Sequence, residues 1–563
     1  MKIEAKNIKW LALLILVVLG FLVYANSFKN ELFWDDDDGI VNNVYIKDFS
    51  YFPKYFSENL IAGSGQISNY WRPLVLISFA VDYKLSGLNP FGYHLSNTIL
   101  HILAAWLSFL LLYKISGKKF LSLAVAVIFL VHPLQTEAVT YVSGRADSLS
   151  AIFVLLSTLS YFNFRQENNK KYLAVSLLAF TLALLVKEQS ITLPGLIFLV
   201  ELFFFFNKKK WRDSLRYFLP FALIAGVYFV LRVFLLNFND LLSGVDYSDV
   251  YDSSLKIRLL TFTKVFVKYF SLLFLPFNQH MAYEIAPVTS LFSWAFLKFT
   301  ILVSGLIYVI KKYWSSHKLV IFGLAWFIVL LLPRTNIISI NRPLYEHWLY
   351  LPMLGFWLAV ILLLQELIKK INLKKVVIWY IILFLILYFS ALTIKRNLDW
   401  RDPITFYEKN LKYTPNSFIQ RNNLGMAYAG DDRFEDAIKE YQKAIAIADI
   451  YPQVHYNLGN ALVALGRTQE AEIEYYRTIE MSPQFSFPYN NLLRLATMKK
   501  DEVKLKKVLD KLKNNFEEEY YLEQAFYAYY SLDKKEKALE IGRELLQKYP
   551  KRTDIGLIML NIR

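Results

Sequence analysis

Long apolar runs, separated by short polar loops, recur through residues 1–394. A helix needs roughly 20 mostly apolar residues to cross a bilayer, and most of these runs approach that length. After residue 394 the pattern changes to polar, helix-prone sequence. The pattern therefore predicts an all-α chain, with a polytopic membrane domain over 1–394 and a soluble helical domain after it. The eleven expected spans are 8–27, 94–113, 119–133, 147–164, 172–186, 190–206, 215–236, 291–310, 319–333, 348–366 and 376–394.

The first apolar run, IKWLALLILVVLGFLVYA at 8–25, is too long for a signal-peptide core and lacks a small-residue cleavage site, so we expect a membrane anchor. Basic clusters between the runs predict the orientation, because such clusters favour the cytoplasmic side. With eleven crossings they share one face, which places the N-terminus in the cytoplasm and the C-terminal domain outside. The clusters are Lys2/Lys6/Lys9, Lys118/Lys119, Arg165/Lys170/Lys171, Lys208–Lys210 with Arg212, Lys311/Lys312 and Lys369/Lys370/Lys374/Lys375.

A twelfth apolar segment, 255–276, would break this alternation if it crossed the membrane. It carries Lys264 and Lys268 on one helical face. We therefore expect an interfacial or re-entrant helix there.

The chain has 563 residues, of which 55% are hydrophobic and 17% aromatic, and its formal net charge is +16. The loop lysines account for much of this charge, so we predict no nucleic-acid partner. There is no cysteine, which excludes disulfides and thiolate metal sites. Together with the short lysine-rich loops, this favours a bacterial plasma membrane over an endoplasmic-reticulum-type membrane.

Three expected spans, 119–133, 172–186 and 319–333, are short. A helix of about 15 residues rises only about 22 Å, against a hydrocarbon core of about 30 Å. Each ends, on the predicted outer side, in polar residues that are costly in lipid. Snorkelling helix ends are the alternative for any one of them, but three together predict a watery cavity in the outer half of the membrane. These residues are His132 with Glu137, Lys187 with Glu188, and Arg334.

The C-terminal domain repeats with the 34-residue period of tetratricopeptide units. NNLGMAYAGDDRFEDAIKEYQKAI and YNLGNALVALGRTQEAEIEYYRTI share the pairs Leu424/Leu458, Gly425/Gly459, Ala437/Ala471 and Tyr441/Tyr475. A weaker unit follows near 486–518 and a final unit over 519–552. We place the repeat domain at 418–563 and interpret 395–417 as a linker or half-repeat. Such arrays are typical of peptide-docking surfaces, with a purely structural role as the alternative.

Four consecutive aspartates, Asp35 to Asp38 in FWDDDDGIVNN, follow the first span. Counting back from Gly39 places Trp34 at the first ligand position of an EF-hand loop, so that motif is excluded. Crowded carboxylates raise one another's pKa values by repulsion, which favours a general base that accepts a proton from a hydroxyl nucleophile. The alternatives are a hydrated turn and, less favoured, a divalent-cation site from two of the four carboxylates. We predict no metal and no other cofactor.

Several longer stretches carry a resemblance to a known family. They are FWDDDDGIVNN at 33–43, YWRPLVLISFAVDYKLSGLNPFGYHLSNTILH at 70–101, HPLQTEAVTYVSGRADSLSA at 132–151, KEQSITLP at 187–194 and NRPLYEHWLYLPMLG at 341–355, followed by the repeats. In this order they resemble the transmembrane and tetratricopeptide-repeat-containing (TMTC-type) O-mannosyltransferases and their prokaryotic relatives, in the GT-C class of glycosyltransferases.

That resemblance implies inverting transfer of a hexose, typically mannose, from a polyprenyl-phosphate carrier to Ser or Thr hydroxyls of an acceptor protein, which the repeats would dock. It places the catalytic acidic pair at Asp35 and Asp36. The candidates for binding the donor phosphate are Arg72, Arg145, Lys187, Arg334 and Arg342. The candidates for the substrate pocket are His132, Glu137, Asp147, Glu346 and Tyr350. His347 stands where the resemblance leads us to expect an arginine.

Three rival functions stay open at the level of sequence. One is a transferase that modifies a lipid or a cell-wall glycan, with the same site. Another is a non-enzymatic membrane scaffold that displays the repeats. The third is a transporter, against which the absence of obvious paired halves counts.

Overall fold

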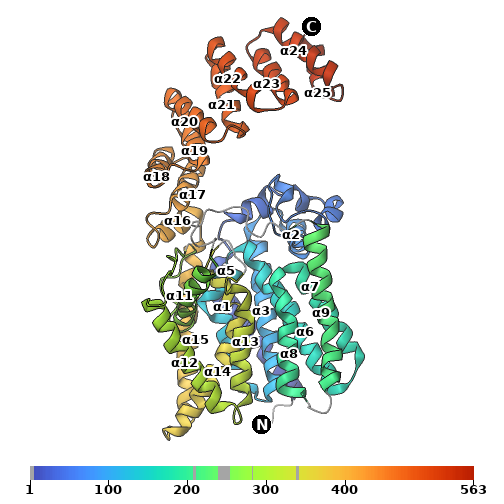
Figure 1. Cartoon of the computed structure of the whole chain (residues 1–563), viewed down its shortest axis with the longest axis vertical. Helices are drawn as coiled ribbons and strands as arrows, with labels where there is room; N and C mark the ends of the chain where they lie inside the picture. The colour runs from blue at the N-terminus through green and yellow to red at the C-terminus, as the bar shows by residue number, and fades with distance from the viewer. Residues whose placement is uncertain are drawn as a thin grey trace. The chain divides into compact units, whose positions relative to one another are not determined.

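The computed structural model describes residues 5–206, 211–236, 238, 254–281, 283–337 and 342–562. Lys2 and Lys208–Lys210, which belong to two of the basic clusters, lie outside the described residues. The described part is helical and contains no β-strand, which confirms the predicted fold class. The chain divides into two compact units, Met1–Phe406 and Tyr407–Arg563, at a point inside the segment 395–417 (Figure 1).

Each of the eleven predicted spans coincides with a helix of the first unit. These helices are α1 (Ala5–Tyr24), α3 (Pro90–Ser116), α4 (Lys119–Val131), α6 (Arg145–Glu167), α7 (Lys170–Val186), α8 (Leu193–Val200), α9 (Trp211–Val230), α12 (Trp294–Tyr313), α13 (Lys318–Leu331), α14 (Pro352–Lys370) and α15 (Val376–Asn397). Three further helices of this unit are α2 (Pro73–Ser86), α5 (Thr136–Val139) and α11 (Leu255–Phe274).

Within the described residues, eight helical segments are long and apolar enough to cross a membrane. A ninth candidate is the pair formed by α4 and Pro133–Val139, which are bent by 54° relative to each other. Pro133 has no backbone N–H to continue the helical hydrogen bonds, which explains the break. The remaining two predicted spans are α7 and α13, with 17 and 14 residues. The three segments that the sequence marks as short are thus the three that do not form a simple span.

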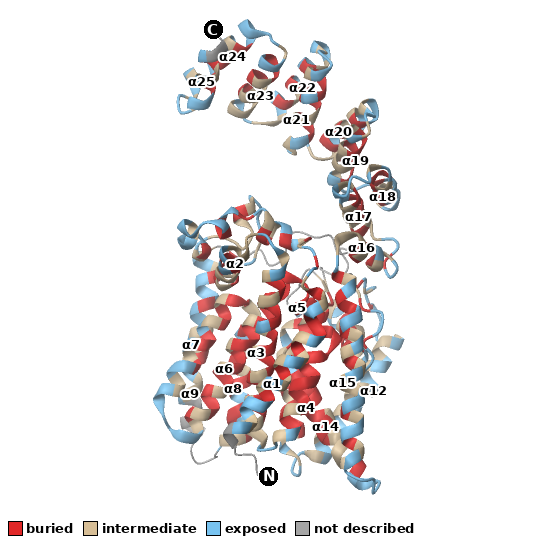
Figure 2. Ribbon diagram, turned by 180° about the vertical axis from the view of Figure 1, so that it is seen from behind, coloured by how far each residue is buried: buried red, intermediate tan, exposed pale blue. Residues whose placement is uncertain are grey.

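Close helix packing builds the core of the first unit, where buried residues gather on α3, α4, α6 and α14 (Figure 2). At one point α13 and α14 touch through two glycines. A Cβ on Gly323 would lie 2.5 Å from the carbonyl oxygen of Gly355, and one on Gly355 would lie 2.3 Å from that of Gly323. Small residues at such contacts let membrane helices approach closely.

The peripheral helix α12 buries none of its residues within the unit. One side of the helix packs against the core, whereas the apolar side chains of the other side are exposed, Ile301 to 65%. Apolar surface on this scale suits contact with lipid better than contact with water.

The second unit consists of antiparallel helix pairs, as the repeat predicts. Its helices are α17 (Phe418–Gly430), α18 (Phe434–Ile447), α19 (Pro452–Ala464), α20 (Thr468–Met481), α21 (Ser486–Met498), α22 (Glu502–Asn515), α23 (Glu518–Ser531), α24 (Lys535–Lys548) and α25 (Thr553–Ile562). The helix α16 (Pro403–Leu411) crosses the boundary between the units.

The repeat residues pack as their chemistry predicts. A Cβ on Gly425 would lie 2.5 Å from the ring of Tyr441, and one on Gly459 would lie 2.5 Å from the ring of Tyr475. Each glycine therefore makes room for the aromatic ring of its partner helix. This confirms the tetratricopeptide reading of the sequence.

Candidate active site

The aspartate run occupies an irregular segment between α1 and α2. Trp34, just before it, has a positive φ of 64°, which is rare for a bulky side chain. Residues Asp37–Val41 then form one turn of π-helix. Such turns are frequent at functional sites, and strained backbone persists only where the surrounding structure fixes it.

Asp35 is the exposed member of the predicted acidic pair. Its Oδ2 accepts a 2.6 Å hydrogen bond from the hydroxyl of Tyr141. The Tyr141 ring is stacked between Trp34 and Trp400, with ring centroids 5.2 and 5.3 Å away. Because both faces of the ring are covered, the hydroxyl has a fixed direction toward the carboxylate.

Several groups act on the charge of Asp35. The surrounding protein displaces water from its carboxylate and so raises its pKa. The hydrogen bond from Tyr141 opposes this shift, and the positive charges of Arg72 and Arg342 also favour the ionised form. Both arginines therefore lie within electrostatic reach of the accessible carboxylate.

Asp36 is buried, with only 2% of its surface exposed. Its Oδ1 accepts two hydrogen bonds from Ser143, one from the backbone N–H at 2.8 Å and one from the hydroxyl at 2.5 Å. Burial raises the pKa of Asp36 to about 7 despite these bonds. A buried and doubly bonded carboxylate suits a positioning role.

The sequence predicts that mutual repulsion raises the pKa values of the run, but the main cause in the structure is different. Loss of hydration is the larger cause for Asp36, and repulsion from Asp35 and Asp37 comes after it. The same order holds for Asp37, whose pKa rises to about 6 through desolvation first and repulsion from Asp38 second. The fold around the run therefore matters more than the adjacency of the four acids.

Cationic side chains from three separate motifs gather beside this segment. Arg72 makes two hydrogen bonds to Glu188, at 2.7 and 3.2 Å. Lys187 donates to Asp147 at 2.6 Å. Loss of hydration lowers the pKa of Lys187, and repulsion from Arg72 and Arg334 adds to this shift. Arg72 binds Glu188, the residue next to Lys187 in the chain, so these two cations are neighbours.

Arg334 is the least neutralised member of this group. Its side chain is 7% exposed, and its guanidinium lies 4.2 Å from the centroid of the Trp348 ring. Among the described residues, its buried Nη2 has no hydrogen-bond partner. Desolvation lowers the pKa of Arg334 to about 10, so it remains charged at neutral pH. A buried cation with a free donor is suited to bind an anion.

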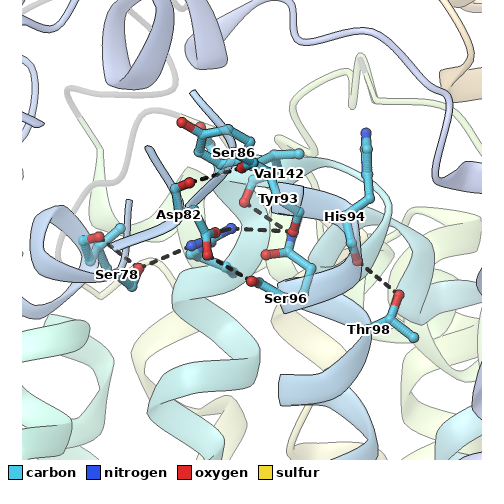
Figure 3. Close-up of polar contacts among 12 residues, drawn as sticks. Ser78, Asp82, Ser86, Tyr93, His94, Ser96, Thr98 and Val142 are labelled. Atoms are coloured by element: carbon cyan, nitrogen blue, oxygen red, sulfur yellow. Dashed lines mark hydrogen bonds and ion pairs between the residues drawn. The ribbon is translucent and has the colours of Figure 1, made fainter. Parts of the chain in front are cut away.

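Arg145 and Arg342 differ in their surroundings. Arg145 is 1% exposed, forms a 2.6 Å ion pair with Asp82 and lies 4.5 Å from the centroid of the Phe79 ring. Ser78 also accepts a hydrogen bond from Arg145 at 3.3 Å, and Figure 3 shows that Ser96 is bonded to Asp82. These contacts favour a structural role for Arg145. Arg342 is only half-buried, and its guanidinium lies 5.9 Å from the centroid of the Tyr345 ring.

Hydrogen bonds inside the protein hold two of the predicted pocket residues, His132 and Tyr350, in place. His132 Nε2 lies 3.1 Å from the carbonyl oxygen of Leu273, and His132 Nδ1 accepts from the N–H of Leu134 at 3.2 Å. Both ring nitrogens are thus engaged, which favours the structural alternative for this histidine. Tyr350 is buried, and its hydroxyl lies 2.6 Å from Nδ1 of His101.

Glu137 and Glu346 are both buried, and Glu346 lies 3.9 Å from a guanidinium nitrogen of the buried Arg396. Glu137 accepts hydrogen bonds from the backbone N–H groups of Glu346 and His347, at 2.9 and 3.2 Å. It also lies 2.5 Å from Nδ1 of His347. Glu346 in turn accepts from Tyr283 at 2.6 Å and from Gln279 at 2.7 Å. These bonds fix the segment that carries His347, which sequence reasoning did not place in the site.

A second feature missed at the sequence level is a stripe of buried polar side chains on α3. His94, Asn97 and His101 follow one another at spacings of three and four residues, so they share one face of the helix. All three are buried, with 1% exposure or less. The sequence could have revealed this stripe, because polar residues at helical spacing inside an apolar span indicate a buried polar face.

Each residue of the α3 stripe holds a segment of the site by its backbone carbonyls. Figure 3 shows His94 and Thr98 on α3 next to Val142. The stripe contacts are His94 Nε2 to Asn30 O at 3.1 Å, Asn97 Nδ2 to Val139 O, Tyr141 O and Val142 O at 3.1, 3.3 and 3.2 Å, and His101 Nε2 to Leu130 O at 3.0 Å. Asn97 thus holds the loop that carries Tyr141 and Ser143, the partners of the two aspartates.

The described residues contain no group of three or more His, Asp or Glu side chains arranged to hold a metal ion.

Family models match both parts of the chain. A model described as dolichyl-phosphate-mannose-protein mannosyltransferase matches residues 92–236. Two further models, described as TPR repeat and tetratricopeptide repeat, match residues 431–466 and 452–485.

Similar proteins extend over most of the chain. The mouse protein O-mannosyl-transferase TMTC3 is 27% identical over 521 residues, which cover 85% of this chain and 55% of that protein. The Caenorhabditis elegans protein O-mannosyl-transferase F38B6.6 is 26% identical over 461 residues, which cover 78% of this chain and 63% of that protein. The human protein O-mannosyl-transferase TMTC1 is 34% identical over 206 residues, 33% of this chain and 23% of that protein.

These comparisons confirm the resemblance to the TMTC-type O-mannosyltransferases. The chain spans little more than half the length of the mouse relative. Among solved structures, the crystal structure of MamA protein shares 22% identity with a TM-score of 0.24 and covers 27% of this chain and 83% of that chain.

Proposed function

We propose that the chain is a membrane glycosyltransferase that moves a hexose, mannose by analogy with the names of its relatives, from a polyprenyl-phosphate carrier to Ser or Thr hydroxyls of proteins. One juxtaposition supports the proposal above the others. The exposed carboxylate of Asp35 lies within electrostatic reach of Arg72, which belongs to the same group of cations as Lys187 and Arg334.

In this proposal Asp35 is the general base. Its ionised carboxylate accepts the proton of the acceptor hydroxyl as that oxygen attacks C1 of the sugar. The new C1–O bond forms as the bond from C1 to the phosphate oxygen breaks, so the configuration at C1 inverts. Polyprenyl phosphate leaves with the bonding electrons. Tyr141 orients Asp35, and Asp36 holds the segment through Ser143.

The cations stabilise the leaving group. Negative charge builds up on the phosphate as the C1–O bond breaks, and donors already in place at that point lower the barrier. Arg334 contributes its Nη2, which has no hydrogen-bond partner in the described part of the chain, while Lys187 and Arg72 share their charge with Asp147 and Glu188. Arg342 stands at the exposed side of this group.

We further propose that this site faces away from the cytoplasm, in the plasma membrane of a bacterium, with the repeats on the same side. The aspartate run follows α1, Lys187 follows α7, and Arg334 follows α13. The lysine pair Lys118/Lys119 lies at the start of α4, and Lys369/Lys370 lies at the end of α14. In both helices this is the end that lies farther along the chain from the predicted pocket residues His132 and Tyr350. The preference of such clusters for the cytoplasm supports this orientation.

The decisive test is transfer in vitro with the purified chain, a mannosyl-phosphoryl-polyprenol and peptides that contain Ser or Thr. Asp35→Asn should abolish mannosylation of the peptide, whereas Asp38→Asn, a matched change in the same run, should retain it. Full activity of Asp35→Asn would refute the assignment of the base. Transfer to added lipid or glycan but not to peptide would support the rival acceptor class, and no transfer to any acceptor would support the scaffold.

A further inference from the structure

A recess in the repeat unit has a surplus of positive charge. It has a volume of about 560 Å³ and is lined by residues of α22, α23 and α24. Four of the lining residues are lysines, namely Lys506, Lys507, Lys511 and Lys537. The recess is distant in sequence from every residue placed in the candidate active site, so it needs an explanation of its own.

The lysines of the recess differ from those lysines of the same repeats that are bound in ion pairs. Lys499 and Lys504 both bind Glu472, at 3.0 and 2.5 Å, and Lys548 binds Glu518 and Glu544, both at 2.8 Å. By contrast, none of the four recess lysines forms an ion pair in the described part of the chain. Four lysines without an ion pair among the described residues thus line one recess.

The carboxylates at the recess leave this surplus in place. Glu502 lines the recess but pairs with Lys534 at 2.7 Å, outside the lining. Asp510 is the other acid of the lining. The lining thus has four lysines against two acids, of which Glu502 is already paired and Asp510 has no ion-pair partner among the described residues. Such a site attracts an anionic ligand.

Two of the lysines are also restrained by aromatic rings. The ammonium group of Lys537 lies 4.4 Å from the centroid of the Tyr529 ring, and that of Lys507 lies 5.3 Å from the centroid of the Tyr476 ring. Of these two rings, only that of Tyr529 lines the recess, so the contact with Tyr529 holds Lys537 at the wall, whereas Lys507 lies against α20. Lysines that anchor a protein to a membrane instead extend freely toward the lipid head groups.

We infer that this recess binds an acidic segment of a partner protein. An extended peptide presents carboxylates to the lysines and amide groups to Asn514, which also lines the recess. Val503, at the same recess and 82% exposed, offers an apolar contact that a simple inorganic anion would not use. Stacked helical repeats commonly bind extended segments of this kind.

Under the proposed function, the partner would be an acceptor protein whose acidic segment lies away from its Ser or Thr site. Only this last step rests on the proposed function, since the recess and its charge do not depend on catalysis. The chain with Asp35→Asn should therefore still bind the acidic segment. Loss of transfer with intact binding would separate the two proposals.

The test is fluorescence anisotropy with the full chain in detergent micelles and a labelled peptide of alternating glutamate and serine. Removal of two lysine charges, in Lys506→Gln with Lys511→Gln, should weaken binding about tenfold, which corresponds to about 1.4 kcal/mol. The control, Lys499→Gln with Lys548→Gln, removes the same net charge at paired lysines and should weaken binding less than about twofold.

Specificity for carboxylates is tested with a peptide in which glutamine replaces glutamate, which should bind about tenfold more weakly or worse. Equal weakening by the two lysine pairs, or equal binding of the two peptides, would overturn the inference. Capture of vesicles that contain anionic phospholipid through Lys506 and Lys511, without peptide binding, would also overturn it and identify a lipid surface instead.

Discussion

The hydroxyl of Tyr141 donates a 2.6 Å hydrogen bond to Asp35, although the two residues are 106 positions apart in the chain. This bond joins the aspartate run after α1 to the loop that precedes α6. Trp34 and Trp400 cover the two faces of the tyrosine ring and fix its direction. The orientation of the accessible carboxylate therefore depends on a residue that is not itself acidic or basic at neutral pH.

Tyr141→Phe should lower activity while it leaves the aromatic stack in place. A hydrogen bond to a charged group contributes about 1.5–3 kcal/mol, so we expect a loss of about 10- to 100-fold in kcat/KM. The bond also lowers the pKa of Asp35, so its removal raises that pKa. Since the base must be ionised, the acidic limb of the pH–rate profile should move to higher pH. Tyr380→Phe, at an exposed tyrosine, serves as control. An unchanged acidic limb would contradict the role of Tyr141.

Asp36→Asn should stabilise the protein at high pH. Burial raises the pKa of Asp36 to about 7, so the native state binds this proton more tightly than the unfolded state does. The pKa of Asp36 is near 4 in the unfolded state and about 7 in the native state. The free energy of unfolding therefore falls as the pH rises from about 4 to about 7, because the native state must then either keep the proton or bury a charge. An uncharged amide avoids this loss.

Thermal unfolding in detergent between pH 4 and pH 8 checks this prediction. The variant should be more stable than the parent at pH 8, by on the order of 2–4 kcal/mol, and the difference should shrink toward pH 4. A variant that is less stable at pH 8 than the parent would show that the charged form of Asp36 is stabilised by its bonds to Ser143. Activity should fall in the same variant, because the segment that carries Asp35 is then held differently.

Arg334→Gln should act on the lipid-linked donor and not on the acceptor. Arg334 is buried and its Nη2 has no partner among the described residues, which suits a direct bond to the donor phosphate. Loss of a charge-assisted bond of about 1.5–3 kcal/mol predicts about a 10- to 100-fold rise in the KM for the donor. The KM for the acceptor peptide should change little. Arg401→Gln, at an arginine that is 65% exposed, is the control. Equal changes in both KM values would speak against a phosphate contact.

The sequence predicted most of the fold because hydrophobic runs and the 34-residue repeat report directly on helices and their packing. Each predicted span coincides with a helix, and Gly425 meets Tyr441 as the repeat requires. The bend at Pro133 was not predicted as such, although the shortness of 119–133 pointed to an irregular span.

The site was predicted less completely, since residue type does not reveal which partner a side chain finds. Asp35 and Asp36 are adjacent in sequence, yet one is exposed and the other buried, and this difference arises from Ser143 and Tyr141 on a distant loop. Arg145 belongs to the same motif as Asp147, but it pairs with Asp82 and not with the cationic group. Charge alone could not separate these roles.

The last prediction concerns Asn97, whose amide lies within hydrogen-bond distance of three carbonyl oxygens in the loop that carries Tyr141 and Ser143. Asn97→Leu has a similar volume but no donor, so the carbonyls of Val139 and Val142 lose a buried partner. The unsatisfied groups cost about 1–3 kcal/mol each, and the loop should relax away from the aspartates.

Asn97→Leu should therefore reduce kcat by about 10- to 100-fold while the KM for the donor changes little, because the cations lie on other segments. A general loss of folding would instead lower the amount of active protein and leave the pH–rate profile unchanged. The acidic limb of that profile is thus the discriminating measurement, and it should shift because Tyr141 no longer holds Asp35 in place. Ser108→Ala, which removes a buried hydrogen bond to Ala104 on the same helix, should leave the profile and kcat as they are. If the Ser108 variant shifted the profile as strongly as Asn97→Leu, the effect would belong to α3 as a whole and not to the amide of Asn97.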